Sequence, residues 1–249
     1  MSPVVDLSQM QITGEEVLKI LLYGPSGAGK THLVGTFPGP IYVFDFDHKW
    51  KPLIGRQVKL DSYDTNKDVA VSEYNRFRKT LEEVIKNPEY KTICIDSMST
   101  LDPLIFQFLM KQSGRAMEYP DIQTYGHHMD AWSWLVMQLN SPRCKKNVIL
   151  IGHDQYKVDD TSSVHRICPL ISGDKIQGKL PGLCEETYYY IPVTGGSPPK
   201  RTRRLYYVNN GKAVASSATL SGVGYLDDPT YDTIRSEMAK CIEARKAGK

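Results

Sequence analysis

The segment that most restricts the possible folds of this chain is "YGPSGAGKTHL", Tyr23–Leu33, which follows the apolar run "VLKILL". Glycines weaken regular structure, so their position directly after a strand-like run indicates a loop whose backbone must be exposed. The spacing of Gly24, Gly29, Lys30 and Thr31 fits G-x-x-x-x-G-K-[ST], a pattern in which successive backbone N–H groups cradle an anion. The sequence therefore predicts a strand, a phosphate-binding loop and a helix, in this order.

Each residue of this loop is a candidate ligand of a nucleoside triphosphate. We expect Lys30 to face solvent in the free protein and to reach the β- and γ-phosphates, and the Thr31 hydroxyl to ligate Mg²⁺. The alternative is a glycine-rich turn whose lysine is simply solvated. The predicted cofactors are ATP and Mg²⁺, and the predicted phosphate-binding residues are Gly24, Pro25, Ser26, Gly27, Ala28, Gly29, Lys30 and Thr31.

Composition limits the class of protein. The 249 residues are 41% hydrophobic and 24% charged, which suits one large globular domain. No apolar run approaches the roughly 20 residues of a membrane span, and the N-terminus has no basic region followed by an apolar stretch. We therefore expect no membrane segment and no signal peptide. The odd number of scattered cysteines predicts reduced thiols in a cytoplasmic protein; they are Cys94, Cys144, Cys168, Cys184 and Cys241.

Four nearly continuous apolar runs predict strands that are buried on both faces, as in a parallel sheet. They cover residues 17–23, 41–47, 91–96 and 147–153. Amphipathic helices separate them, and their buried faces are predicted to be Tyr74, Phe77, Leu81, Val84 and Ile85 in one helix and Ile122, Tyr125, Met129, Trp132, Leu135 and Leu139 in another. This order predicts an α/β fold with a mostly parallel central sheet flanked by helices.

The pattern changes after His153. Residues 154–180 are polar with no clear period, and two β-rich runs at 187–193 and 204–210 predict a C-terminal antiparallel hairpin. A last helix is predicted between 228 and 247. We expect a single domain over residues 1–249, with a core of about 17–210 and a C-terminal extension at 211–249.

Polar side chains at the ends of three predicted strands are candidate catalytic groups. Asp96 follows "TICI" and is predicted to ligate Mg²⁺ together with Thr31. Asp45 and Asp47 alternate along their strand and are expected to point to the same side, so either is a candidate base that activates water. His153 is a candidate sensor of the γ-phosphate. The alternatives are turn caps for the acids and a structural role for the histidine.

Together these segments resemble the RecA-type ATPase core. "VFDFDH" resembles the strand that carries the catalytic glutamate, with Asp47 at that place, and "VILIGHDQ" resembles the strand that ends in the γ-phosphate-sensing glutamine, with His153 at that place. "TICIDSMSTL" resembles the Walker B strand and its helix. The phrase "GPSGAGKTHLVGTFPGPIYVFDFD" is closer to phage-encoded RecA-like proteins of single-strand annealing and recombination. The resemblance implies a Mg²⁺-dependent ATPase, slowed by its Asp and His, in the host cytoplasm.

The resemblance also implies partners. Stretches 111–126 and 154–175 match the DNA-contacting loops of RecA-like proteins, which predicts single-stranded DNA as a ligand in recombination, annealing or replication. Two alternatives are an ATP-gated loader that binds a helicase or single-strand-binding protein, and a small-molecule kinase. RecA-like sites are completed between subunits, so a homo-oligomer is expected. The candidate basic residues acting in trans are Lys200, Arg201, Arg203 and Arg204.

Overall fold

The chain is built around a mixed β-sheet whose order confirms the predicted α/β class with a mostly parallel central sheet. A computed structural model describes residues 16–114, 119–158, 165–195 and 200–248. The strands of its nine-stranded sheet are, in spatial order, β11 (Tyr225–Asp227), β9 (Lys200–Tyr206), β8 (Glu186–Gly195), β1 (Lys19–Tyr23), β5 (Asn147–Gly152), β4 (Thr92–Asp96), β2 (Ile41–Asp45) and β3 (Val58–Ser62), with β10 (Ser216–Ser217) also paired to β8.

From β8 to β3 the neighbouring strands are all parallel, whereas β9, β10 and β11 pair antiparallel. The four predicted strands correspond to β1, β2, β4 and β5, whose side chains are almost all buried. The predicted C-terminal hairpin corresponds to β8 and β9, although β9 begins and ends four residues earlier than the predicted run at 204–210. Because the ends of parallel strands share one edge of the sheet, the loops that follow β1, β2, β4 and β5 meet there.

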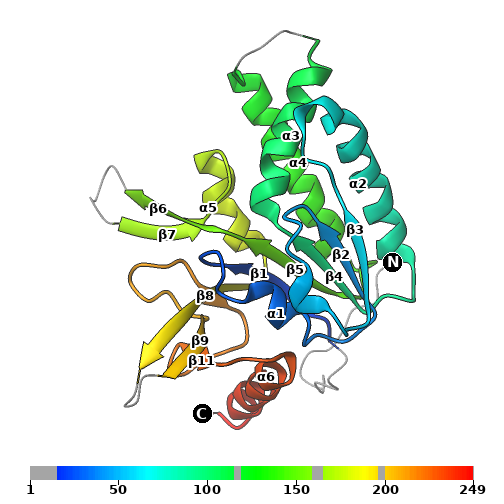
Figure 1. Ribbon diagram of the computed structural model, residues 1–249. Helices are drawn as coiled ribbons and strands as arrows, with labels where there is room; N and C mark the ends of the chain where they lie inside the picture. The colour runs from blue at the N-terminus through cyan, green and yellow to red at the C-terminus, as the bar shows by residue number, and fades with distance from the viewer. Residues whose placement is uncertain (1–15, 115–118, 159–164, 196–199, 249) are drawn as a thin grey trace.

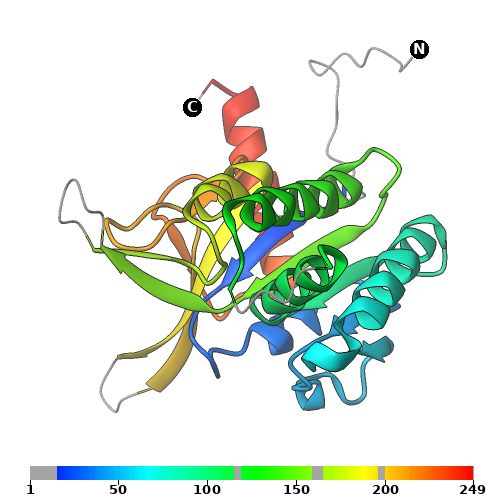
Figure 2. The same ribbon diagram turned by 90° about the horizontal axis from the view of Figure 1, so that it is seen from above.

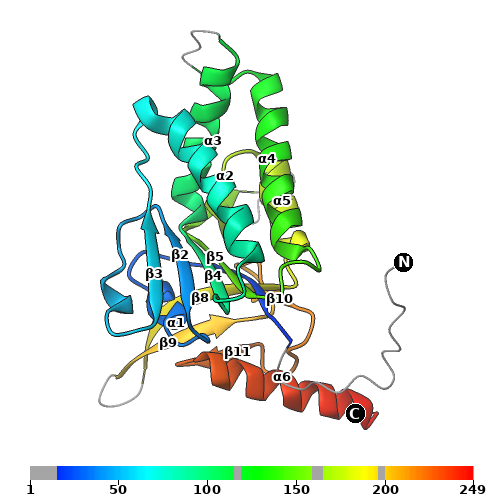
Figure 3. The ribbon, with the colours of Figure 1, turned by 90° about the vertical axis from the view of Figure 1, so that its right-hand side faces the viewer.

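Helices cover both faces of the sheet (Figures 1 and 3). One face carries α2 (Ala70–Lys86), α3 (Met98–Gln112), α4 (Ile122–Asn140) and α5 (Asp174–Leu183), and the other carries α1 (Lys30–Val34) and α6 (Tyr231–Lys246). Each face has its own apolar core, the first rich in aromatic rings and the second built on β1, α1 and α6. Short 3₁₀ turns η2 (Lys51–Leu53) and η3 (Lys67–Val69) complete the connections around β3.

The predicted helix faces are confirmed for α2 and only in part for α4. Trp132, Leu135 and Leu139 are buried, but Ile122 is 88% exposed and Tyr125 is also exposed. The first turns of α4 extend beyond the sheet, so no strand lies beneath them to cover the apolar stripe (Figure 3). The prediction that these two residues belong to the core was wrong.

The polar stretch after β5 is also more regular than the sequence indicated. It forms a hairpin of β6 (Asp154–Val158) and β7 (His165–Pro169), followed by α5. The hairpin projects from the side of the molecule, so few of its residues are buried (Figures 1 and 2). Residues 211–248 add β10, β11 and α6 to the same sheet and helix layers, and the division into a core and an extension stays a prediction.

The cysteines are unpaired, as expected. Among the described helices, none is both long and apolar enough to cross a bilayer.

Candidate functional site

The loop between β1 and α1 has the backbone geometry of an anion cradle. Gly24 must be a glycine because a Cβ on it would lie 2.1 Å from the carbonyl oxygen of Tyr190. Gly29 has a φ of +97°, which L side chains rarely adopt. Within the described chain, the N–H groups of Gly27 and Gly29 donate to no protein acceptor. Backbone N–H groups that are not used within the protein can donate hydrogen bonds to a phosphate group.

Lys30 is buried rather than solvent-facing, so that expectation was wrong. Its side chain is 6% exposed, and Nζ donates to the carbonyl oxygens of Gly24 at 2.7 Å and Pro25 at 2.9 Å. The ammonium group therefore bonds to the backbone of the loop that it crosses. Burial lowers the pKa of Lys30 to about 8, although the carboxylates of Asp96 and Asp47 oppose the shift.

Thr31 and Asp96 lie side by side, as the predicted metal site requires. The Thr31 hydroxyl donates to Asp96 Oδ2 at 2.7 Å, although 65 residues separate the two in the sequence. Burial raises the pKa of the Asp96 carboxyl to about 6; the Thr31 hydrogen bond opposes this shift, whereas Asp47 and Asp45 add to it. A buried carboxylate next to a hydroxyl is a hard oxygen pair that fits Mg²⁺.

The residues around this pair do not by themselves form a complete metal cage. No group of three or more His, Cys, Asp or Glu side chains is placed for a metal ion within the described ranges. Mg²⁺ is usually held by one or two protein oxygens and completed by waters and substrate phosphates, so a two-residue site agrees with that ion.

Asp47 and His153, two candidates that follow the ends of β2 and β5, contact each other directly. His153 Nε2 lies 3.0 Å from Asp47 Oδ2. The hydroxyl groups of Ser97 and Thr100, at the start of α3, both donate to Asp47 Oδ1, the former at 2.8 Å. Burial would raise the pKa of Asp47, but the hydrogen bonds from His153, Thr100 and Ser97 outweigh it and hold that pKa well below its usual range. Asp47 is therefore an ionised acceptor with a fixed orientation.

Asp45 faces away from this group, contrary to the expectation that both acids point to one side. Strand β2 ends at Asp45, and the chain then turns through His48, whose φ is +56°. The alternation of a strand no longer applies beyond that point. The Asp45 carboxylate accepts from the His48 backbone N–H at 2.8 Å and from the Ser62 hydroxyl at 3.0 Å. It caps a turn and ties β2 to β3.

The phosphate-binding loop, the Thr31–Asp96 pair and the Asp47–His153 pair all contribute to one hollow of about 420 Å³, which we call the phosphate hollow. Asp47 lines it and Asp45 does not. Its lining residues are Ser26, Gly27, Gly29, Lys30, Thr31, His32, Asp47, Lys49, Pro52, Asp96, His153 and Arg203.

The four basic residues of the hairpin differ in their surroundings. Arg203 lines the phosphate hollow of its own chain, whereas the sequence predicted a role in a neighbouring subunit. Arg201 joins Arg203 and Gly27 around an adjacent hollow of about 360 Å³. Arg204 points the other way and forms two hydrogen bonds with Asp227 at 2.6 and 2.9 Å. Lys200 is exposed. Arg203 therefore lies beside the phosphate hollow of its own chain, and the role of these residues in trans stays a prediction.

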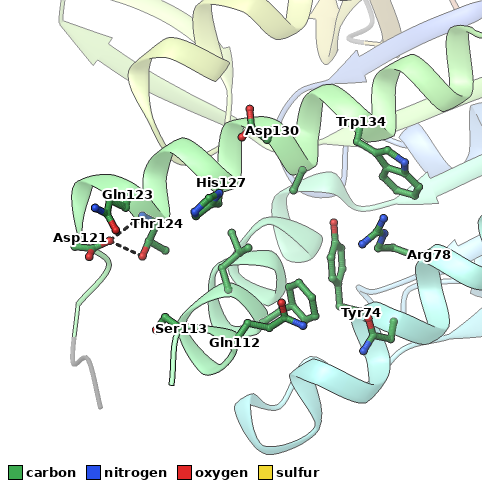
Figure 4. A pocket seen from close by; sticks show the side chains of 14 residues that line it. Tyr74, Arg78, Gln112, Ser113, Asp121, Gln123, Thr124, His127, Asp130 and Trp134 are labelled. Atoms are coloured by element: carbon green, nitrogen blue, oxygen red, sulfur yellow. Dashed lines mark hydrogen bonds between the residues drawn. The ribbon is translucent and has the colours of Figure 1, made fainter. Parts of the chain in front are cut away.

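A larger hollow, of about 690 Å³, lies between α2, α3 and α4; we call it the helix hollow (Figure 4). Arg78 at one end is stacked over the ring of Trp134 at 4.4 Å. Asp121 at the other end accepts hydrogen bonds from the N–H and hydroxyl groups of Thr124. Backbone N–H groups of a glycine-rich loop do not line it, so we do not place the phosphates there.

Sequence reasoning identified the groups of the phosphate hollow but missed several of their contacts. It gave no sign of the Asp47–His153 pair or of Ser97 and Thr100, which lie in the predicted "TICIDSMSTL" segment. A hydroxyl-rich stretch just after a strand-end aspartate was the available signal. The proposed DNA-contacting stretches fall on the α3–α4 connection and the β6–β7 hairpin; residues 115–118 and 159–164 of them lie outside the described residues.

A profile of the protein family described as "AAA domain" matches residues 16–217. No protein in the curated set matches the sequence. Among solved structures, the chain is similar to the flagellar accessory protein FlaH from Methanocaldococcus jannaschii, with 12% identity, a TM-score of 0.37, and coverage of 86% of this chain and 92% of that chain.

Proposed function

The chain belongs to the AAA domain family, and from this premise we propose that it binds ATP with Mg²⁺, hydrolyses it, and acts on single-stranded DNA in phage recombination, annealing or replication. One observation carries the ATPase part of the proposal. The glycine-rich loop, the Thr31–Asp96 pair and the Asp47–His153 pair come from separate segments and open into one hollow.

In this proposal the loop and Lys30 bind the phosphates, and Thr31 and Asp96 hold Mg²⁺. Lys30 exchanges the carbonyl oxygens of Gly24 and Pro25 for phosphate oxygens, which are better partners for a buried ammonium group. When bound, Mg²⁺ neutralises the negative charge that builds up on the phosphate oxygens during transfer.

Hydrolysis also requires a group that orients the attacking water. Asp47 is ionised and fixed by three side chains, with His153 on its outer oxygen. We assign the pair the task of accepting a hydrogen bond from that water and of contacting the γ-phosphate. Because the low pKa of Asp47 makes it a weak proton acceptor, orientation rather than proton abstraction is its main contribution.

The β6–β7 hairpin supports the proposed binding of single-stranded DNA. Tyr156 is 75% exposed on it, and the neighbouring Lys157 points to the opposite side, where Nζ contacts Asp174 and Gln177. An exposed tyrosine on a projecting strand can stack on a base of any sequence. The hairpin begins at Asp154, directly after His153, so a change at the γ-phosphate has a short covalent path to it.

The test is phosphate release with and without single-stranded DNA, measured on the wild type, Tyr156→Ala and Tyr156→Phe. We expect DNA to accelerate release by the wild type and the Phe variant. Loss of stacking should weaken DNA binding by the Ala variant about tenfold, from roughly 1–3 kcal/mol per stacked base. Failure of single-stranded DNA to bind the wild type would refute this part of the proposal and leave the ATPase part standing.

A second candidate function is an ATP-gated mediator that binds another replication or recombination protein. The observation that favours it is the apolar start of α4, where Ile122, Tyr125 and Ile176 line a hollow of about 680 Å³. Under this alternative Ile122→Ser would abolish binding to a single-strand-binding protein or helicase, and Tyr156→Ala would have no effect on either partner.

A further inference from the structure

Two hydrogen bonds between the backbone of Arg203 and Asp228 hold Arg203 in place. Its N–H donates to Asp228 Oδ1 at 2.8 Å, and its carbonyl oxygen accepts from the Asp228 N–H at 2.6 Å. Asp228 adopts a φ of +43°, in the left-handed region, directly after β11 pairs with β9. These two bonds fix which face of β9 the Arg203 side chain occupies.

The neighbouring arginine, Arg204, shows that the face of β9 on which a side chain lies determines its partners. Arg204 points to the other side of β9, where Asp227 binds it at two positions and the ring of Tyr225 lies 3.9 Å from its guanidinium carbon. Arg203 is half-buried, and among the described residues no carboxylate lies within ion-pair distance of its guanidinium group. A cation without a counter-ion at this position is suited to an anionic ligand.

The guanidinium group lies against the phosphate loop. A Cβ on Gly29 would be 2.7 Å from Arg203 Nε and 3.1 Å from its Cζ. Gly29 therefore has a second reason to be a glycine, besides its positive φ: a side chain there would displace the arginine. Arg203 also lines the phosphate hollow together with Lys30 and Asp96, although its strand belongs to the antiparallel part of the sheet.

We propose that Arg203 is a phosphate-binding residue that acts in cis, on the nucleotide bound to its own subunit, with Asp228 as its positioning residue. This inference rests on the proposed ATP site. In the phosphate hollow the carboxylates of Asp47 and Asp96 face the cations of Lys30 and Lys49. These two positive charges are matched by the two negative ones, so a bound triphosphate would bring negative charge that a further cation can neutralise. The planar guanidinium group of Arg203 can bind two phosphate oxygens at once.

The experiment measures equilibrium binding of ATP and ADP over a range of protein concentrations. The variants are Arg203→Ala, Arg203→Lys and the matched control Arg204→Ala, with Lys30→Ala as reference. We expect Arg203→Ala to weaken ATP binding about 10- to 100-fold at every protein concentration, as for loss of a hydrogen bond to a charged group. Arg203→Lys should lose less, and Arg204→Ala should bind as the wild type does. Circular dichroism and thermal unfolding check that each variant is folded, and Arg203→Gln replaces Arg203→Ala if it is not.

Mixing separates cis from trans. If Arg203 acts in cis, an equimolar mixture of Arg203→Ala and Lys30→Ala regains no turnover, because neither subunit has a complete site. Recovery in the mixture, or a binding defect that depends on protein concentration, would overturn the inference in favour of a neighbour's arginine. Wild-type affinity in a folded Arg203→Ala variant would overturn it as well. If the wild type itself does not bind ATP, or Lys30→Ala binds equally well, it is the proposed ATP site that fails.

Discussion

The phosphate hollow and the helix hollow are made from different kinds of structure, and the proposed chemistry lies in the smaller of the two. The phosphate hollow, at about 420 Å³, is lined by the loops that follow β1, β2 and β5, by the first turn of α1, by Asp96 at the end of β4 and by Arg203 of β9. The helix hollow, at about 690 Å³, is lined by side chains of α2, α3 and α4 and by residues at their ends. Size therefore does not indicate which hollow binds a ligand.

What separates the two hollows is the state of their polar groups. In the phosphate hollow, the N–H groups of Gly27 and Gly29 donate to no acceptor among the described residues, and Lys30 donates to two carbonyl oxygens of the loop. In the helix hollow, Arg78 already stacks on Trp134, and Asp121 already caps α4. Loops at the ends of parallel strands can aim backbone donors at one point, whereas side chains on helices readily find partners on their own or the next helix.

The largest expected effect concerns two acids, one inside the phosphate hollow and one just outside it. Asp47→Asn should lower turnover by about 10²–10⁴ and leave ATP affinity nearly unchanged, because it removes the group that orients water. Asp45→Asn is the matched control, since it changes a buried acid two residues away that caps a turn and binds Ser62 but does not line the phosphate hollow. Steady-state turnover and equilibrium ATP binding of both variants provide the check. Turnover lost in Asp45→Asn and kept in Asp47→Asn would reverse the assignment.

Removing the lysine of the phosphate hollow should have the next largest effect. Lys30→Ala should weaken ATP binding about 10- to 100-fold, as for loss of a charge-assisted hydrogen bond. Since the side chain is buried, the variant also removes the hydrogen bonds that Lys30 donates to the carbonyl oxygens of Gly24 and Pro25, of which Pro25 keeps the Ala28 N–H as a donor; the cost should be about 1–3 kcal/mol in the free energy of unfolding. Titration calorimetry and thermal unfolding measure the two effects, with the exposed Lys240→Ala as a control. An unchanged ATP affinity in a folded variant would contradict the site.

Much of the phosphate hollow was predictable because its residues occur in short segments with fixed spacing. The loop motif, the apolar runs of β1, β2, β4 and β5, and the polar residue at the end of each run all appear in the sequence. Strands that are buried on both faces give a continuous apolar signal. The elements that were missed lack this signal: β3 is an edge strand with mixed burial, and β6 and β7 lie largely outside the core.

Contacts between distant segments were not predictable from a single sequence. Asp45 and Asp47 face different surroundings because β2 ends at Asp45. The alternation of apolar and polar residues in the sequence does not show where a strand ends. The position of Arg203 at the phosphate hollow depends on the pairing of β9 with β8 and β11. The burial of Lys30 depends on the path of the loop around it. Each of these is a property of tertiary structure.

The smallest expected effect lies in the helix hollow and tests whether the two hollows are independent. Arg78→Ala removes the stacking of the guanidinium group on Trp134, which should lower the free energy of unfolding by about 0.5–1 kcal/mol. For a chain of this size that corresponds to a fall in Tm of about 1–4 °C. ATP affinity and turnover should stay within about twofold of the wild type, since no phosphate contact changes. Lys79→Ala, an exposed cation on the same helix, controls for the loss of charge.

The two hollows do share α3, whose first turn holds Asp47 through Ser97 and Thr100 and whose last turn lines the helix hollow. A clear loss of turnover in Arg78→Ala with no change in Tm would therefore show that α3 transmits a change from one hollow to the other, and that the larger hollow takes part in function.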